Sequence, residues 1–291
     1  MSTTKNIAQI LPPPQTHMVG DGFRVQNFFP SGYRITKEIS PFYLMDYNAP
    51  WELPPSDKQR GVGVHPHRGF ETVTIAFQGS VAHHDSAGNS GVIGPGDVQW
   101  MTAGSGVLHK EYHEENFTKK GGIFHMVQLW VNLPAKHKMT TPKYQGITFE
   151  QQGKLSLPND SGKASVIAGE LNGVKGPAET FTPINMFTIS LKPNKEFSFD
   201  IPANHNTGIL VLSGNCLINE VSARNNDFVL FKHDGTNIHL HSTEETQLLV
   251  LSGEPIDEPI AQYGPFLMNT QAELQQAMED FNNGKFGQLA D

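Results

Sequence analysis

Short apolar stretches, each followed by turn residues, make up most of the pattern of hydrophobic and polar positions along the chain. In the first half they include Glu71–Phe77, Val98–Thr102 and Ile123–Leu133, which are rich in β-branched and aromatic residues. Turns that contain glycine separate them, as at residues 86–91 and 94–97. Because short strands at this spacing with such turns are typical of sandwiches and barrels, the pattern predicts an all-β fold.

The second half of the chain repeats this pattern after a polar stretch without periodicity, residues 134–154. When the halves are aligned without gaps, Asn226–Phe231 matches Gly96–Met101, which indicates an internal repeat. We therefore predict two domains in tandem, an N-terminal domain over residues 1–140 and a C-terminal domain over residues 141–291.

The two ends of the chain differ from the repeated pattern. Residues 1–20, with three consecutive prolines, are predicted to be irregular. Near the C-terminus, Thr270 and Glu273 have the spacing of a capping box. An apolar stripe at helical spacing follows, formed by Leu274, Ala277, Met278 and Phe281. With Gly284 as a stop signal, the segment predicts one amphipathic α-helix that packs against a barrel.

Composition and charge exclude several classes of protein. The chain of 291 residues has a net charge of −8 and no run of lysine and arginine, so direct nucleic-acid binding is not expected. Its single cysteine, Cys216, cannot form an intrachain disulfide, which suits a reducing cytosol. The sequence has no signal-peptide pattern and no apolar run of about 18 residues. We therefore predict a soluble cytoplasmic protein without a membrane partner.

Two pairs of candidate metal ligands lie in the first half, with one residue between the members of each pair. The pairs are His65 with His67 and His109 with Glu111. Side chains at positions i and i+2 of a β-strand point to the same face, so each pair can direct both side chains at one point. Two strands that pair inside a barrel would then offer one divalent metal three imidazoles and a carboxylate. This set suits Fe, Mn, Co, Ni, Cu or Zn rather than Ca or Mg, and it leaves two positions of an octahedron open.

The second half does not repeat the whole ligand pattern. The alignment places His239 opposite His109 and His241 opposite Glu111, but no His-x-His pair precedes them as His65 and His67 do. We therefore predict that the C-terminal domain is metal-free. The histidines His239 and His241 are then expected to be hydrogen-bonded or to face solvent.

Other polar residues near the ligand pairs have simpler explanations. Three histidines are predicted at the surface, namely His83, His84 and His113. His125 lies on an otherwise apolar strand face and is predicted to be a hydrogen-bonded interior histidine. Glu71 is predicted to be a structural or second-layer residue, and Arg68 either forms a salt bridge or is solvated.

The segments around the ligand pairs are similar to those of a known family. The stretch His65-Pro66-His67-Arg68-Gly69-Phe70-Glu71-Thr72 and the stretch of residues 96–111 closely resemble the signature segments of the pirin family, bicupins of the cupin superfamily. Residues 263–270 and 283–287 resemble the C-terminal signature of that family. The resemblance runs from about residue 20 to the end of the chain. It implies two cupin barrels in tandem.

The resemblance also implies what the ligand pairs bind. In pirins, the positions that match His65, His67, His109 and Glu111 hold one metal ion, usually iron, and the second cupin holds none. Iron(II) is therefore the expected cofactor, and Zn, Mn, Co, Ni and Cu are the other candidates.

Two functions are implied by the resemblance. Some pirins are associated with quercetin 2,3-dioxygenase activity, in which O2 cleaves the ring of a flavonol. In such a reaction Glu111 either takes a proton from the substrate hydroxyl or serves only as a ligand. Other pirins are described as metal-dependent, redox-sensitive regulators that act through protein partners. We predict the dioxygenase, with a flavonol-like aromatic substrate and O2, and keep the regulator as the alternative. The enzyme requires a cavity wide enough for a planar polyphenol beside the metal.

Overall fold

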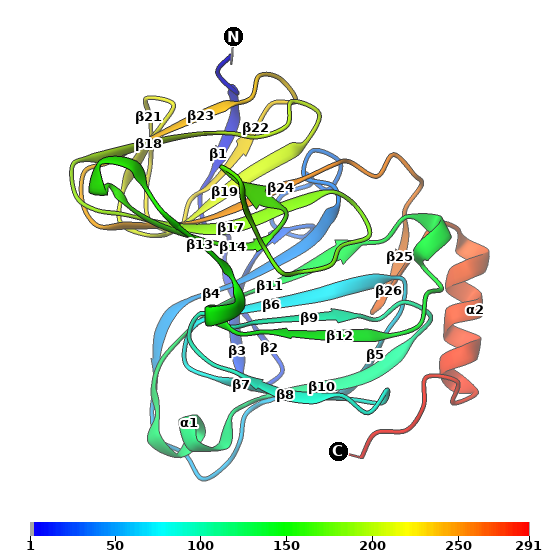
Figure 1. Cartoon of the computed structure of the whole chain (residues 1–291). Coiled ribbons are helices and arrows are strands. Elements are labelled where there is room, and N and C mark those ends of the chain that lie inside the picture. Colours follow the sequence, from blue (N-terminus) through cyan, green and yellow to red (C-terminus); the bar gives the residue numbers. More distant parts are fainter. Residues whose placement is uncertain (1–2, 291) are drawn as a thin grey trace. The chain divides into compact units, whose positions relative to one another are not determined.

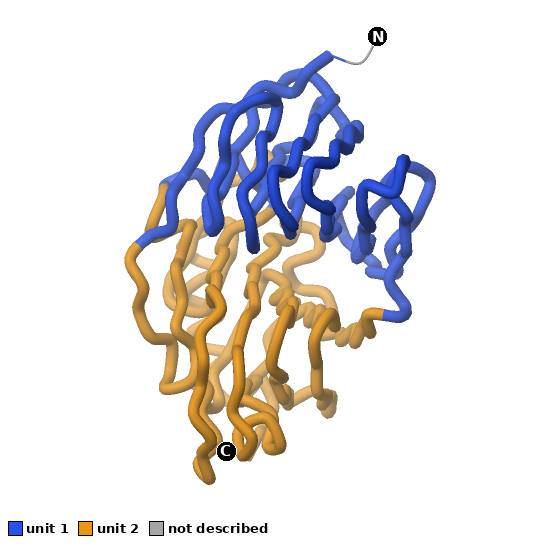
Figure 2. The backbone as a smooth tube through the Cα atoms, turned by 90° about the vertical axis from the view of Figure 1, so that its left-hand side faces the viewer, with its two compact units in different colours: residues 1–14, 34–41, 150–255 blue, residues 15–33, 42–149, 256–291 orange. Residues whose placement is uncertain are grey.

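Antiparallel strands make up most of the computed structural model, which describes residues 3–290 (Figure 1). Residue contacts divide the chain into two compact units, and each unit is assembled from three separate stretches (Figure 2). Unit 1 comprises residues 1–14, 34–41 and 150–255, and unit 2 comprises residues 15–33, 42–149 and 256–291. This division differs from two continuous domains, because the N-terminal strand pairs within unit 1 and the C-terminal segment packs within unit 2.

Unit 2 contains a sheet of seven strands and a sheet of four strands. The first has the order β12-β9-β6-β11-β4-β3-β2 and the second has the order β5-β10-β7-β8. The strands of the first sheet are β2 (Thr16–Val19), β3 (Phe23–Phe29), β4 (Phe42–Leu53), β6 (Phe70–Gln78), β9 (Val98–Thr102), β11 (Gly122–Asn132) and β12 (Lys143–Ile147). Those of the second are β5 (Gly61–His67), β7 (Val81–Asp85), β8 (Ser90–Ile93) and β10 (Val107–His113). Phe23, Ala76 and Val81 belong to one buried cluster, so apolar side chains of both sheets share a core.

Unit 1 is built in the same way. Its larger sheet has the order β1-β22-β19-β24-β17-β14-β13 and its smaller sheet has the order β18-β23-β20-β21. The strands of the larger sheet are β1 (Ile7–Leu11), β13 (Gly153–Ser156), β14 (Gly162–Ala168), β17 (Ile184–Leu191), β19 (Asn206–Ser213), β22 (Phe228–Phe231) and β24 (Thr246–Gly253). Those of the smaller sheet are β18 (Lys195–Asp200), β20 (Cys216–Ile218), β21 (Val221–Ala223) and β23 (Asn237–Ser242). Because β22 holds the place in unit 1 that β9 holds in unit 2, the predicted internal repeat is confirmed.

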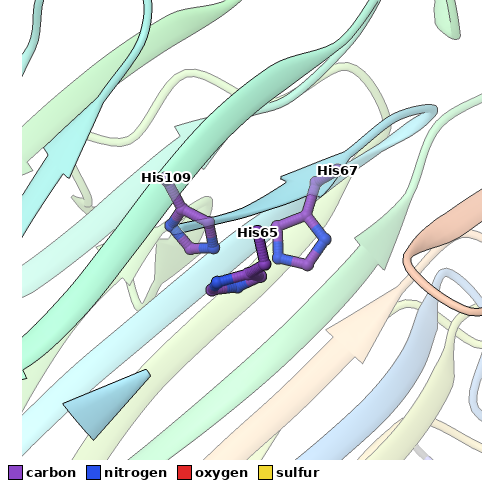
Figure 3. A group of neighbouring side chains, drawn as sticks. All are labelled: His65, His67 and His109. Carbon is purple, nitrogen blue, oxygen red and sulfur yellow. The ribbon is translucent and has the colours of Figure 1, made fainter. Parts of the chain in front are cut away.

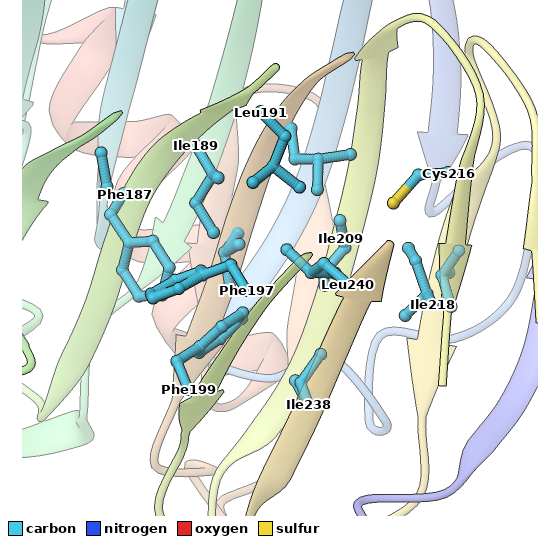
Figure 4. Close-up of a cluster of buried hydrophobic side chains, with 14 of the residues drawn as sticks. Phe187, Ile189, Leu191, Phe197, Phe199, Ile209, Cys216, Ile218, Ile238 and Leu240 are labelled. Carbon is cyan, nitrogen blue, oxygen red and sulfur yellow. The ribbon is translucent and has the colours of Figure 1, made fainter. Parts of the chain in front are cut away.

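Apolar side chains fill the interior of unit 1 (Figure 4). The core includes Phe187, Phe197, Phe199, Ile209, Ile238 and Leu240, together with the predicted core residue Cys216. On β23, the buried Ile238 and Leu240 alternate with the half-exposed His239 and His241. The Nδ1 atom of His239 lies 2.9 Å from Ser198 Oγ, and that of His241 lies 3.1 Å from Glu196 Oε1. Both histidines are thus hydrogen-bonded, as predicted, and neither reaches the interior.

Several predicted loops contain regular structure. Residues 1–20 include β1 and β2, so the prediction of an irregular lead-in is wrong; both strands lie at sheet edges, where long-range pairing orders them. The polar stretch at residues 134–154 includes β12 and the 3-10 helices η1 (Ala135–His137) and η2 (Phe149–Gln151). A short helix, α1 (Glu115–Lys120), was not predicted. The remaining short elements are η3 (Pro158–Asp160), β15 (Glu170–Leu171) and β16 (Val174–Lys175).

The C-terminal segment forms the hairpin β25 (Ala261–Tyr263) and β26 (Phe266–Met268), followed by helix α2 (Gln271–Asn282). Both halves of the predicted capping box are present, because Thr270 Oγ1 accepts from the Glu273 backbone N–H and Glu273 Oε2 accepts from the Thr270 backbone N–H. Leu274 and Ala277 are buried against the hairpin, while Phe281 is 39% exposed. The predicted C-terminal helix is confirmed. Across residues 3–290, neither α1 nor α2 has the length and apolar character to cross a membrane.

A buried carboxyl group lies on β6 at Glu71. Its Oε1 atom accepts a 2.7 Å hydrogen bond from Thr102 Oγ1. Glu71 and Thr74 differ by three positions, an odd number, so the two side chains point to opposite faces of the strand. Burial raises the pKa of Glu71 to about 7. We infer a structural role, in line with the sequence prediction.

Replacing Thr270 with alanine should lower the free energy of unfolding by about 1 kcal/mol, because the amide of Glu273 loses its acceptor. Thr270→Ser keeps the hydroxyl and should remain close to the wild type. Chemical denaturation followed by circular dichroism measures both variants. An equal loss in the serine variant would contradict a capping role.

Glu71 should make stability depend on pH. Since its folded-state pKa of about 7 lies above the usual 4.5, the folded protein holds the proton more tightly. This contribution is complete below about pH 4.5 and is lost as the pH rises through 7, which amounts to a loss on the order of 3 kcal/mol. Denaturation of Glu71→Gln between pH 4.5 and 8 should lack this decline, whereas the exposed control Glu52→Gln should keep it. Parallel profiles for Glu71→Gln and the wild type would rule out the effect.

Candidate metal site

Strands β5 and β10 bring the predicted histidines together. The two strands pair antiparallel, with His65 opposite His109 and His67 opposite Val107. The three imidazoles point toward one another (Figure 3), and their ring centroids lie 4.2 to 4.8 Å apart. One potential ligand atom from each ring lies within 4.8 Å of the others. The spacing of i and i+2 on paired strands is what creates this cluster.

Hydrogen bonding leaves one ring nitrogen of each histidine available. His65 Nδ1 donates to the Gly63 carbonyl oxygen at 2.8 Å, so its Nε2 keeps the lone pair. His67 Nδ1 and His109 Nε2 are buried and have no hydrogen-bond partner. Buried nitrogens without partners are rare in folded proteins, and a metal ion would satisfy them. The donor set therefore fits a divalent transition metal.

The environment of His67 and His109 favours their neutral form. Burial, followed by the neighbouring imidazoles, holds the pKa of His109 well below its usual value. The same two causes lower the pKa of His67. A hydrogen bond with the backbone of Pro265 has the opposite, smaller effect on this pKa. Neutral imidazoles offer lone pairs to a metal, whereas protonated ones do not.

Glu111 lies two residues beyond His109 on the same buried face of β10. Its Oε2 atom accepts from Gln128 Nε2 at 2.7 Å, and its Oε1 atom accepts from Thr74 Oγ1 at 3.3 Å. A potential ligand atom of Glu111 lies within 4.8 Å of those of His109 and His83, in a second group that shares His109 with the first. The structure thus brings all four predicted residues to one region, with three imidazoles in one group and Glu111 beside it.

His83 contacts the candidate site, although the sequence pattern places it at the surface. The residue is fully buried, and its Nδ1 atom lies 3.5 Å from His109 Nδ1. Gln99 Nε2 donates to His83 Nδ1 at 3.0 Å, and Asp85 Oδ2 accepts from His83 Nε2 at 3.3 Å. The prediction for His83 is wrong because β7 pairs with β10 and turns its alternate side chains inward. The His83-x-Asp85 spacing on a strand was the available signal.

The other predicted histidines divide into two groups. His84 is exposed, as predicted, but His113 is buried and packs against Phe124 at a ring distance of 4.6 Å. Since His113 follows Glu111 by two residues, strand alternation already places it on the inner face. His125 is buried and hydrogen-bonds Tyr47 at 3.1 Å, which confirms its prediction as an interior histidine.

Two cations fix the turn that follows His67. Arg68 forms a buried ion pair with Asp280 of α2 at 2.9 Å and donates to the Ser105 carbonyl oxygen at 2.7 Å. The ammonium group of Lys138 donates to the Gly69 carbonyl oxygen at 2.9 Å. Gly69 has a φ of 88°, which L side chains rarely adopt. The turn therefore holds the first ligand pair rigidly against the C-terminal segment.

A cavity of about 400 Å³ lies beside the candidate site within unit 2. His65, His67 and Glu111 form part of its wall, together with Gln128 and Asp46. The apolar wall consists of Val19, Phe23, Val25, Leu44, Val62, Met126, Trp130 and Pro265. This volume falls within the range of small-molecule pockets, about 300 to 1,000 Å³.

Comparisons with known proteins agree with this architecture. The family described as Pirin matches residues 22–131, and the Pirin C-terminal cupin domain matches residues 186–287. A Pseudomonas aeruginosa protein named putative quercetin 2,3-dioxygenase is 47% identical over 282 residues, which cover 97% of this chain and 98% of that protein. Pirin of Homo sapiens is 37% identical over 257 residues, or 86% of this chain and 84% of that protein.

A solved structure is also similar over the whole chain. The crystal structure of quercetin 2,3-dioxygenase from Acinetobacter baumannii matches with a TM-score of 0.94 at 45% identity, covering 99% of this chain and 100% of that one. This match confirms the predicted fold of two cupin domains in tandem. By sequence and by structure, the chain belongs to the pirin family.

Proposed function

We propose that this protein is a dioxygenase of the quercetin 2,3-dioxygenase type, which cleaves a flavonol-like ring with O2 at an iron(II) site held by His65, His67, His109 and Glu111. The observation that carries the proposal is the cavity of about 400 Å³, because it offers space for a small aromatic molecule directly beside His65, His67 and Glu111. The names of the relatives at 47% and 45% identity support the same reaction class.

Each proposed ligand has a defined donor atom. The ring nitrogens that can offer a lone pair to a metal are His65 Nε2, His67 Nδ1 and His109 Nε2. Three neutral imidazoles with one carboxylate suit iron(II), and also Zn, Mn, Co, Ni or Cu. Bound iron(II) would supply open coordination positions and the electrons that activation of O2 requires.

Glu111 is the proposed base for the substrate hydroxyl. Gln128 and Thr74 donate hydrogen bonds to its two oxygens, which fixes the orientation of the carboxyl group. An ionised carboxylate in this orientation can accept the proton of a phenolic hydroxyl that enters from the cavity. The apolar walls, including Phe23 and Trp130, lower the polarity around the reacting groups.

The alternative is a metal-binding, redox-sensing regulator that acts through protein partners. Such a protein does not require an apolar cavity beside its metal, so the cavity favours the enzyme. The proposal further includes a cytoplasmic location and no direct binding of nucleic acid or membranes.

Removing one ligand should abolish both metal binding and turnover. We expect His67→Ala, loaded anaerobically with iron(II), to bind less than one metal per chain and to show no O2 uptake or carbon monoxide release with quercetin. The exposed His84→Ala serves as the matched control and should behave as the wild type. Stoichiometric metal without turnover in the wild type, for every divalent metal tested, would refute the dioxygenase and favour the regulator.

Glu111→Gln separates the two roles of the carboxylate. If Glu111 is the base, the variant should keep its metal and lose about 10²- to 10⁴-fold in turnover, because an amide cannot accept the proton. Metal content by elemental analysis and turnover with quercetin are measured on the same sample. Loss of the metal together with activity would show that the metal requires the Glu111 carboxylate as a ligand, and would contradict the expected metal-loaded, slow variant.

His83 should tune metal affinity through His109. Its replacement by leucine removes the polar partner of His109 Nδ1, and partners of this kind typically contribute about 10- to 100-fold to metal affinity. Competition with a chelator measures the affinity, and His84→Leu on the same strand is the control. Equal affinity in both variants would mean that His83 does not act on the metal.

A further inference from the structure

Polar side chains form one row across the inner face of the large sheet of unit 2. Strand register places Asn27 opposite Asp46, Asp46 opposite Gln128, Gln128 opposite Thr74, and Thr74 opposite Gln99. Residues directly opposite each other on neighbouring strands share a face. The row therefore crosses five strands, β3, β4, β11, β6 and β9, on the side of the sheet that lines the cavity.

Most members of the row already serve the candidate metal site. Gln128 and Thr74 donate to Glu111, and Gln99 donates to His83, which contacts His109. Asn27 hydrogen-bonds Asp46 and Ser31 rather than the site residues, and Asp46 is the other exception. Its Oδ1 atom accepts a 2.7 Å hydrogen bond from Asn27 Nδ2, and no bond to another side chain of residues 3–290 engages its Oδ2 atom.

Asp46 also forms part of the cavity wall. It is one of two carboxylates there, and the other is Glu111. Neighbouring strands lie about 4.8 Å apart, so Asp46 is one strand further from the metal ligands than Gln128. Burial raises the pKa of Asp46, although Asn27 donates to it and His17 lies nearby. The ionised group is thus poorly solvated by the protein itself.

We propose that Asp46 is a specificity-determining residue, which accepts a hydrogen bond from a ring hydroxyl of the aromatic ligand whose chelating end lies at His65, His67 and Glu111. The ligand class is then a polyhydroxylated planar aromatic rather than a purely apolar or an acidic one. A carboxylate in an apolar wall binds a hydrogen-bond donor favourably and repels an anion. This inference rests on the proposed function for the position of the chelating end.

A purely structural role for Asp46 would act through Asn27. The side-chain oxygen of Asn27 accepts from the Ser31 backbone N–H at 2.9 Å. By accepting from Asn27, Asp46 therefore helps to orient the side chain that stabilises the backbone at Ser31. Loss of that role would weaken the binding of every ligand to the same extent. The specificity role changes the ratio between ligands, and this difference separates the two.

The test measures binding to full-length protein loaded with zinc, which prevents turnover. Quercetin and 3-hydroxyflavone share the chelating hydroxyl and ketone groups, but only quercetin has hydroxyls on its outer rings. We expect the wild type to bind quercetin at least about 10-fold more tightly, as one hydrogen bond to a buried carboxylate would give. In Asp46→Ala and Asp46→Asn this preference should fall to within about 3-fold. The exposed Asp57→Ala is the matched control and should keep the full preference.

Each outcome decides between the possibilities. An unchanged preference in both variants, an equal loss of affinity for both ligands, or no binding of either ligand to the wild type would overturn the inference. Asp46→Asn can still accept from Asn27, so it remains informative where alanine disturbs folding, as checked by circular dichroism and zinc content. Turnover of the iron(II) protein is measured separately. Turnover with an unchanged preference refutes only the role of Asp46, and a lost preference without turnover refutes only the oxygenase.

Discussion

Unit 2 depends on one constraint: three imidazoles face one another, and those of His67 and His109 are buried. His67 and His109 each bury a ring nitrogen without a partner, and each such atom costs about 1 to 3 kcal/mol when nothing satisfies it. The arrangement persists only if the backbone is held firmly. The register of β5 and β10 provides this, because a shift of one residue would turn His65 and His67 to the opposite face. The ion pair of Arg68 with Asp280 then fixes the turn that follows.

The same strand order encloses two different interiors. In unit 1, Phe187, Phe197 and Phe199 fill the core, whereas unit 2 has a row of polar side chains and a cavity. Part of this contrast depends on which alternate residues of one strand point into the interior. On β10, His109 and Glu111 occupy the buried positions, but on β23 the residues Ile238 and Leu240 do so. Although the gapless alignment places His239 opposite His109, a difference of one residue in phase moves it to the outer face.

Local periodicity accounts for most of what the sequence could predict. The ligand pairs depend on the two-residue repeat of a strand, and the capping box of α2 depends on four consecutive residues, so both follow from short stretches. The burial of His83 depends instead on β7 pairing with β10, which lies more than twenty residues away in the chain. The same limit applies to β1, because its partner β22 is more than two hundred residues distant. Propensity in a short window carries no information about such pairings.

The charges around the cavity connect the metal to the ligand. Glu111 and Asp46 both face an apolar space, where two carboxylates repel each other more strongly than they do in water. A divalent cation beside Glu111 would offset its charge, while Asp46 lies one strand further away behind Gln128. The carboxylate of Asp46 would then still lack a second hydrogen-bond donor among the side chains of residues 3–290 after the metal is bound. A ligand that chelates at one end and carries a hydroxyl at the other meets both requirements, which neither a purely apolar aromatic nor an anion would do.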